Sequence, residues 1–347
     1  MDELPLAWGP PPARGRIRVA PEDFRVEELL GFAPDGAGAH LLLHVEKRGA
    51  NSGWVAAVLA RVAQVASRDV GASGHKDRDA VTRQYYSLPA AARAPAGGWA
   101  GFEGEGFRVL EATAHGRKLR TGSHRANRFR LVIREVAGDH DAIVQRLRQI
   151  AAGGVPNYFG PQRFGRGGAN LRTARAWADG GSAPRERTAR SFALSAARSW
   201  LYNAVLARRV QAGSWDRLLP GDAAILDGRR SWFCVSSVDE TLRARCLALD
   251  LHPSGPLHGR GDSPVTVAVA ELEQQTAAEE GALIGLLESQ GLVHERRSLR
   301  VPVRSLSWRI EPGTVELEFE LPRGAFATAV LHELLADAWD ASERGEE

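Results

Sequence analysis

The segment SLSWRIEPGTVELEFEL at residues 305–321 decides how we expect this chain to fold. Apolar and polar residues alternate in Ser305–Ile310 and again in Val315–Leu321, which predicts two strands. The residues immediately before them offer no obvious partner strand. We therefore expect these late strands to complete a sheet that begins near the N-terminus.

The first half of the chain has the patterning of that sheet. Helices are expected over Gly53–Ala66, capped by Asn51 or Ser52, and over Asp139–Ala152. A sheet with few helices predicts an α+β fold rather than a doubly wound one. The expected strands are Arg14–Ala20, Phe24–Glu28, His40–Glu46, Val70–Ser73, Tyr85–Leu88, Phe107–Ala114 and Arg128–Val136.

The composition changes after Gly153-Gly154-Val155-Pro156. A chain of 347 residues exceeds what one compact domain usually holds. The sequence thus predicts a domain of residues 1–155 and 304–347, interrupted by an insertion of residues 156–303. Beyond the break we expect helices and Arg-rich loops over 157–210, mixed short elements over 222–250, a turn-rich connector over 252–264, a helical stretch over 268–293 and a helix over 326–338.

Composition excludes several classes of protein. With 44% hydrophobic and 25% charged residues, the chain is neither disordered nor fibrous. It has no apolar run of about 18 residues and no signal-peptide pattern at its start. We expect a cytoplasmic protein that is not inserted in a membrane. We also expect a monomer, because no extended apolar stripe indicates an interface. Its two cysteines, Cys234 and Cys246, are expected to be buried and inert.

Positive charge is concentrated in two segments, although the net charge is only +3. Residues 114–134 hold seven basic side chains and no acidic one, and residues 156–230 hold thirteen arginines against five acids. Such patches indicate a polyanionic partner, although an arginine-rich composition alone is an alternative reading. Only Lys47, Lys76 and Lys118 among 45 basic residues are lysine, which is typical of sites that need a compact ammonium.

The segment GHKDRDA at 74–80 carries the densest chemistry and follows a predicted strand. Neighbouring cations favour the ionised form of Asp77, and an ionised carboxylate is a competent nucleophile. Two alternatives remain open: a solvated turn of alternating charge, and a metal site made by His75, Asp77 and Asp79 on one face of a continued strand. The glycine at 74 and the dense cations disfavour the metal site.

Aromatic residues interleave with the basic segments. Phe24, Phe129 and Phe326 lie in or near them, as do Tyr158 and Phe159 before Arg163. Aromatic faces among arginines commonly stack unpaired bases while the arginines neutralise phosphates. Each ring taken alone is more often part of a core.

Seven ordered motifs together resemble the tRNA pseudouridine synthase D (TruD) family. The similarity runs from about residue 17 to 335 and includes all three lysines. The motifs are PEDFRVEE at 21–28, EKRGANS at 46–52, SGHKDRDAVTRQYY at 73–86, HGRKLR at 115–120, VPNYFGPQRFGRGGANL at 155–171, RSFALSAARSWLYN at 190–203 and LPRGAFATAV at 321–330.

The resemblance implies an isomerase that converts a tRNA uridine to pseudouridine without a metal or organic cofactor. The GxKD motif of the family falls on Asp77, which is implied to be the nucleophile. Lys76 and Arg18 would keep this carboxylate ionised or contact phosphate, and Arg18 stands where lysine is common. The implied substrate-binding residues are Phe24, Asn127, Phe129 and Phe326, with Phe129 stacking on the extruded base; Ala126 replaces the usual glycine before Asn127.

The resemblance also implies a fold and a substrate. The fold is a mixed, mainly antiparallel catalytic sheet with an inserted α/β domain specific to the family. Position 13 in the D arm of glutamate tRNA is the implied target, and the alternative is a catalytically silent tRNA-binding or RNA-chaperone protein. The tRNA backbone would be guided into an interdomain cleft by Arg163, Arg166, Arg172 and Arg175.

Overall fold

The computed structural model describes residues 4–336, which form two compact units. We call Arg14–Ala137 with Arg304–Gly324 the sheet unit. The helical unit contains Gly138–Val303 together with the described residues before Arg14 and after Gly324. Helices and a mainly antiparallel sheet occur in the same chain, so the expected α+β class is confirmed.

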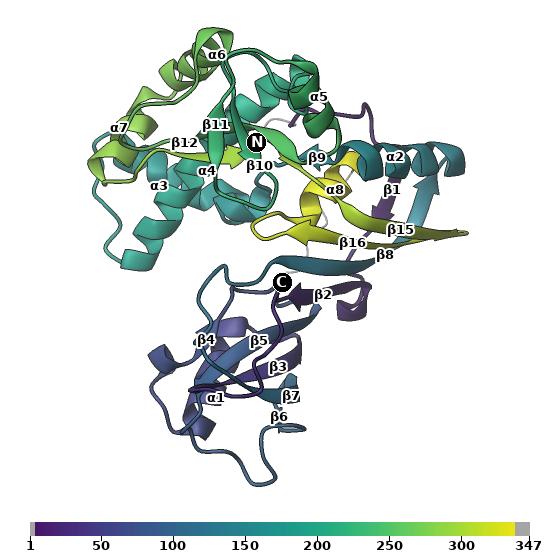
Figure 1. Cartoon of the computed structure of the whole chain (residues 1–347), viewed down its shortest axis with the longest axis vertical. Coiled ribbons are helices and arrows are strands. Elements are labelled where there is room, and N and C mark those ends of the chain that lie inside the picture. The colour runs from purple at the N-terminus through teal and green to yellow at the C-terminus, as the bar shows by residue number, and fades with distance from the viewer. Residues whose placement is uncertain (1–3, 337–347) are drawn as a thin grey trace. The chain divides into compact units, whose positions relative to one another are not determined.

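The sheet unit is built on a ten-stranded sheet (Figure 1). Its order is β15-β16-β8-β2-β5-β3-β7-β6, with β1 paired to β8 and β4 paired to β5. Neighbours along this order are antiparallel except β2 and β5, which run parallel. The elements are β1 (Ala13–Arg16), β2 (Phe24–Leu29), β3 (His40–Arg48), α1 (Ser52–Ala63), β4 (Gly71–Ala72), β5 (Val81–Pro89), β6 (Glu103–Gly104), β7 (Phe107–His115), β8 (Ala126–Gly138), β15 (Arg304–Glu311) and β16 (Thr314–Pro322).

The late strands do complete the early sheet, as the sequence predicts. Strand β16 pairs with β8 from Thr314 opposite Arg134 to Pro322 opposite Ala126. The alternating pattern explains the register, because each strand has one apolar and one charged face. Phe319 lies opposite Phe129, and on the other face Glu320 Oε1 accepts a hydrogen bond of 2.9 Å from Arg128 Nη2.

Helix α1 covers part of this sheet. The side chain of Asn51 caps it by accepting a hydrogen bond of 3.0 Å from the backbone of Gly53. Its buried face packs Val55 and Leu59 against Leu43 of β3 and Tyr86 of β5. Burial of one such side chain stabilises the fold by about 1.5–3 kcal/mol. This packing anchors the end of β3 beside the segment that follows β4.

The helical unit surrounds the long helix α4. Strands β11-β10-β12-β13 form an antiparallel sheet, and β9 pairs with β14. The core gathers Ala196, Leu201, Tyr202 and Leu206 from α4 with residues of the neighbouring helices. The elements are α2 (His140–Gly153), β9 (Val155–Pro156), α3 (Ala169–Ala178), α4 (Arg187–Gln211), β10 (Ala223–Leu226), β11 (Trp232–Cys234), α5 (Glu240–Leu247), β12 (Leu251–Leu257), α6 (Val267–Ala278), α7 (Gly281–Ser289), β13 (Glu295–Ser298), β14 (Arg300–Val301) and α8 (Ala327–Leu334).

The compact units differ from the domain limits that composition predicts. The helical unit begins at Gly138 rather than 156 and also takes in α8. The reason is packing around α2, where buried Arg146 donates a hydrogen bond of 2.6 Å to the carbonyl oxygen of Trp8 and another to that of Glu333 in α8. The predicted limits follow a change in amino-acid composition, whereas the compact units follow contacts between segments that are far apart in the sequence.

Three local predictions need correction. The expected connector over 252–264 contains β12, a buried central strand that pairs with β10 and β13. The expected strand Arg14–Ala20 stops at Arg16, since Arg18 adopts a left-handed backbone with φ 57°. The helix expected over 326–338 ends at Leu334, and residues 337–338 lie outside the described residues.

Candidate active site

Asp77 lies in the segment between β4 and β5 and is held by an arginine from the start of the chain. Its Oδ2 forms an ion pair with Arg18 Nη2, and its Oδ1 accepts a hydrogen bond of 3.3 Å from the backbone of Asp79. The guanidinium Cζ of Arg18 also lies 4.3 Å from the ring centroid of Phe24. The Asp77 side chain is 25% exposed, so a partly solvent-accessible carboxylate is fixed beside a cation.

Lys47 fixes the backbone of the same segment through hydrogen bonds of its ammonium group. Its fully buried Nζ donates hydrogen bonds to the carbonyl oxygens of Asp77 at 2.5 Å, Ala50 at 2.8 Å and Lys76 at 3.4 Å. Burial lowers the pKa of Lys47 to about 8; the charge of Asp77 opposes this shift and that of Lys76 adds to it. A buried ammonium therefore holds the residue that carries the carboxylate.

The ammonium of Lys76 takes part in a buried network with Glu28 and Asn127. Nζ lies 3.0 Å from Glu28 Oε2 and donates a hydrogen bond of 2.7 Å to Asn127 Oδ1. Glu28 Oε1 in turn accepts a hydrogen bond of 2.8 Å from Ser73 Oγ. The expected role of Lys76 beside the Asp77 carboxylate is not what its contacts show. Lys76 instead joins Asn127 to the buried Glu28.

The backbone before Asp77 is positioned by α1 and β5. Ser52 Oγ accepts a hydrogen bond of 2.9 Å from the backbone of Lys76 and donates one of 2.7 Å to Gln84 Oε1. The Gln84 amide donates to the carbonyl oxygen of Gly74 at 3.3 Å. Together with Lys47, these contacts explain why a glycine-containing, highly charged segment has a defined conformation.

The predicted aromatic residues of the sheet unit form a buried cluster. The rings of Phe24 and Phe129 meet edge to face with centroids 6.2 Å apart, and Phe129 stacks on Phe319 at 5.4 Å. Phe129 is only 7% exposed. The ring has little open face in this structure, and stacking of an extruded base on Phe129 stays a prediction. Phe129 is therefore part of the wall that supports Phe24 and Arg18.

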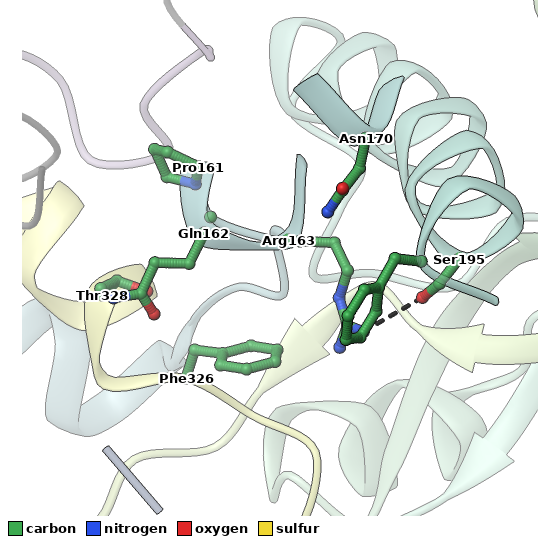
Figure 2. Close-up of a pocket in the computed structure, with 9 residues that line it drawn as sticks. Pro161, Gln162, Arg163, Asn170, Ser195, Phe326 and Thr328 are labelled. Carbon is green, nitrogen blue, oxygen red and sulfur yellow. Dashed lines mark hydrogen bonds between the residues drawn. The ribbon is translucent and has the colours of Figure 1, made fainter. Parts of the chain in front are cut away.

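Phe326 and Arg163 line a cavity of about 330 Å³ in the helical unit (Figure 2). Arg163 Nη1 donates a hydrogen bond of 3.1 Å to Ser195 Oγ, and its Cζ lies 5.7 Å from the Phe326 ring centroid. Burial lowers the pKa of Arg163. Within residues 4–336 it has no ion pair with a carboxylate, so its positive charge is available to an anionic ligand. The remaining walls are Gly160, Pro161, Gln162, Asn170, Phe192 and Thr328.

The other predicted RNA-contacting arginines differ in their surroundings. Arg166 is exposed and has no side-chain partner in the described part of the chain. Arg172 donates to the carbonyl oxygen of Gly167. Arg175 forms an ion pair of 2.5 Å with Glu280 Oε1 and lies over the ring of Trp200. Arg166 is thus the member of this group with the most freedom to bind a phosphate.

The metal-site alternative and the cysteines can be examined in the same way. His75, Asp77 and Asp79 do not gather into a cluster, and residues 4–336 contain no group of three or more His, Cys, Asp or Glu side chains placed to hold a metal ion. Cys246 is buried as expected, but Cys234 is exposed. None of the helices described here is long and apolar enough to span a membrane.

Comparison with known proteins gives one consistent result. The family model "tRNA pseudouridine synthase D (TruD)" matches residues 4–173 and 185–334. Proteins named tRNA pseudouridine synthase D from Methylococcus capsulatus and Nitrosococcus oceani are 47% and 45% identical to the chain, over 96% and 95% of it and 94% and 93% of their own lengths. The chain belongs to the TruD family. The resemblance drawn from the seven motifs is confirmed, and with it the expected enzyme class.

A solved structure supports the fold of this TruD family member. It is the crystal structure of a putative tRNA pseudouridine synthase D from Methanosarcina mazei, with a TM-score of 0.71 and 21% identity. The match covers 96% of each chain. The two proteins therefore share a fold over nearly their whole lengths.

The residues that the resemblance implies for the TruD site are divided between the two units. The sheet unit holds two contacting groups, which the adjacent residues Lys76 and Asp77 join along the chain. Arg18 contacts Asp77 and Phe24, and Phe24 meets Phe129. Lys76 contacts Asn127 and Glu28. Phe326 and the four arginines belong to the helical unit. Sequence reasoning did not assign Lys47, Glu28 or Ser52 to the site; for Lys47, the scarcity of lysine was the signal.

Proposed function

We propose that this chain isomerises a uridine of tRNA to pseudouridine, with Asp77 as the nucleophile. The observation that carries the proposal is the geometry of Asp77, a partly exposed carboxylate paired with Arg18 while Lys47 holds its backbone. An ionised and oriented carboxylate is what nucleophilic catalysis requires. Family membership gives this geometry its substrate class.

The reaction breaks the bond between ribose C1′ and uracil N1 and forms a bond between C1′ and C5. The C5 proton leaves and N1 gains a proton, so the product is an isomer and no oxidant or reductant is needed. The base must first leave the RNA stack to reach the carboxylate. Asp77 attacks either C1′ or uracil C6, and Asp77 or a water it holds accepts the C5 proton.

Each neighbouring side chain has a proposed role. Arg18 keeps Asp77 ionised and fixes its rotamer, while the Phe24–Phe129 cluster keeps Arg18 in place. Asn127, anchored by Lys76, contacts the extruded base or positions Asp77. In the helical unit, the Phe326–Arg163 cavity contacts the nucleic acid, with the aromatic face toward a base and the guanidinium toward an anionic oxygen.

The finer substrate assignment rests on the resemblance alone. We propose position 13 in the D arm, with glutamate tRNA as the first substrate to test. A monomer acting in the cytoplasm, where tRNA is abundant, completes the proposal.

The test is single-nucleotide pseudouridine mapping on unmodified glutamate tRNA transcript. Wild type, Asp77→Asn and the matched control Asp79→Asn are each incubated with the transcript in the presence of EDTA. We expect conversion at one D-arm uridine by wild type and by Asp79→Asn, and none by Asp77→Asn, with tRNA affinity retained in all three. Conversion by Asp77→Asn would refute the nucleophile assignment. Binding without conversion by wild type would instead indicate the silent tRNA-binding protein.

A further inference from the structure

The sheet unit contains a cavity that is larger than the Phe326–Arg163 cavity of the helical unit, and the site described above does not use it. It encloses about 1040 Å³ and lies beside the HGRKLR motif. We call it the basic pocket, and its lining residues are Phe32, Ala33, Asp35, His40, His115, Gly116, Arg117, Lys118, Leu119, Arg120 and Ser123. Its volume is at the upper end of the range of ligand-binding pockets.

An aromatic platform lines the basic pocket. The rings of Phe32 and His115 stack with centroids 5.1 Å apart and an interplanar angle of 14°. His115 Nδ1 lies 2.7 Å from Asp35 Oδ2, and the same oxygen accepts a hydrogen bond of 2.8 Å from the backbone of Gly116. Phe32 is nevertheless 40% exposed. The protein thus holds a large apolar ring in a fixed orientation and leaves part of it open.

The charge of the pocket is not compensated by its own side chains. Arg117 and Arg120 are exposed, and neither has a side-chain partner among residues 4–336. The one carboxylate of the lining, Asp35, is engaged by His115 and Gly116. Lys118 contributes a further positive charge, although its ammonium donates to the carbonyl oxygen of Arg68. Two guanidinium groups without side-chain partners in the described chain therefore line the same cavity as the exposed ring.

A short chain of hydrogen bonds connects the basic pocket with the segment that carries Asp77. Ser123, which lines the pocket, donates a hydrogen bond of 3.2 Å to Ser73 Oγ. Ser73 Oγ donates to Glu28, and Glu28 pairs with Lys76, the residue directly before Asp77. The pocket and the proposed site are neighbours within the same unit.

We propose that the basic pocket binds an unpaired nucleotide of the tRNA other than the reacting uridine, with its base on Phe32 and its phosphates on Arg117 and Arg120. The inference rests on the proposed function for its RNA ligand. An exposed ring flanked by cations is how proteins bind single-stranded RNA, through base stacking and phosphate neutralisation. Extrusion of the target uridine separates neighbouring bases as well, and the hydrogen-bond chain links this pocket to the segment that carries Asp77.

The experiment measures the affinity of the full-length protein for unmodified tRNA transcript as a function of salt. We expect Phe32→Ala to weaken binding by about tenfold without changing the salt slope, because a stacking contact is lost. Arg117→Gln and Arg120→Gln should each reduce the slope by about one, because one phosphate contact is lost. Arg61→Gln, an exposed arginine on α1 outside the pocket, is the matched control and should behave as wild type.

A second arm locates the bound nucleotide. Single abasic substitutions are introduced along the D arm, and each is tested with wild type and Phe32→Ala. Under the proposal, one abasic position other than the target uridine weakens wild-type binding and has no effect on Phe32→Ala. Coupling at the target uridine would overturn it, since the pocket would then hold the reacting base.

Other outcomes separate the two proposals. If wild type forms pseudouridine but all three pocket variants bind tRNA like Arg61→Gln, the pocket inference is wrong and the proposed function stands. If only the arginine variants lose affinity, the base-stacking claim is wrong. If wild type binds tRNA with the predicted pocket dependence but forms no pseudouridine, the proposed catalytic function fails and the pocket inference is supported. Melting temperatures check that every variant is folded.

Discussion

Lys47 shows why one lysine is retained in a chain that otherwise uses arginine. Three backbone carbonyl oxygens converge on its single nitrogen, those of Asp77, Ala50 and Lys76. A tetrahedral ammonium can donate to three acceptors around one point, whereas a planar guanidinium spreads its donors over a fork. The side chain is fully buried, so the protein accepts the cost of burying a charge in order to hold the Asp77 backbone.

The pKa of Lys47 predicts a pH dependence. Its ammonium loses a proton as the pH rises through about 8, which weakens its hydrogen bonds to the Asp77 segment. We expect the single-turnover rate of wild type to fall above pH 8. Lys47→Met should be slower than wild type at pH 7 and should lack the decline near pH 8. Persistence of the same decline in Lys47→Met would assign it to another group.

The pH dependence of stability has the opposite sign to the expected pH dependence of the single-turnover rate, so the two can be separated. The ordinary pKa of lysine is 10.5, and burial lowers it in the folded chain. Between about pH 8 and 10.5 the unfolded chain therefore binds more protons, so this group contributes a stability that increases as the pH rises. Melting temperatures of wild type and Lys47→Met across this window distinguish a loss of active-site geometry from a loss of fold.

At the scale of elements, the pairing of β8 with β16 both stabilises the sheet and holds a residue of the candidate site. One face of β8 places Phe129 against Phe319 in the core, while the opposite face places Arg128 and Arg130 beside glutamates of β16. The first residues of β8 include Asn127, which reaches Lys76. The strand that holds Asn127, which we propose contacts the substrate, is thus fixed by core packing on one face and by ion pairs on the other.

This arrangement predicts a large stability effect for Phe129. Phe129→Ala should lower the free energy of unfolding of the protein by about 3–5 kcal/mol, because it leaves a cavity between Phe24 and Phe319. Arg130→Ala, which removes an exposed pair with Glu318, should cost about 1 kcal/mol or less. Denaturant titration measures both. A Phe129→Ala protein of wild-type stability with reduced tRNA affinity would instead support the predicted base-stacking role.

The periodicity of the sequence predicts most strands of the sheet unit, because each has one buried and one exposed face. It misses β12, whose residues are buried almost throughout and include Pro253, Gly255 and Pro256. A strand paired on both edges in a buried sheet has no alternation to detect, and its prolines suggest a loop. Sequence alone also cannot tell Phe129 as a core residue from Phe129 as a platform.

The candidate site is predictable to a similar extent. The charged segment and the family motifs identify Asp77, but its partner Arg18 lies in the short connection between β1 and a 3₁₀ helix at Pro21–Asp23 and was assigned only by resemblance. Glu28 occupies an inward position of β2 that looks like any polar strand residue. Its role depends on Lys76 and Ser73 meeting it in three dimensions, and no sequence pattern encodes such contacts.

At the scale of the whole molecule, positive charge in the sequence exceeds the charge that is free to bind RNA. Arg175 is paired with Glu280, and Arg209 forms a buried ion pair of 2.8 Å with Asp222. These arginines stabilise the helical unit and add little to an RNA-binding surface. Only arginines without internal partners, such as Arg166, are expected to contribute fully to the electrostatic attraction of tRNA.

This distinction predicts different effects for neighbouring arginines. Arg166→Gln should weaken tRNA binding and reduce the salt slope by about one, as expected for one lost phosphate contact. Arg175→Gln should change the slope less, because its guanidinium is already engaged by Glu280 and Trp200. Affinity titrations at several salt concentrations measure the difference. Equal slopes for both variants would contradict the prediction.

The pairing of β8 with β16 also has a consequence for how the protein is made. In the sheet, Asn127 lies opposite Leu321, about 190 residues later in the chain, and at roughly 5–20 residues per second of translation the ribosome needs roughly 10–40 s to reach it. During that time one edge of β8 has no partner, and unpaired strand edges promote aggregation. The nascent chain therefore exposes this edge until its last strands are synthesised, and a chain truncated before β16 would leave it permanently open.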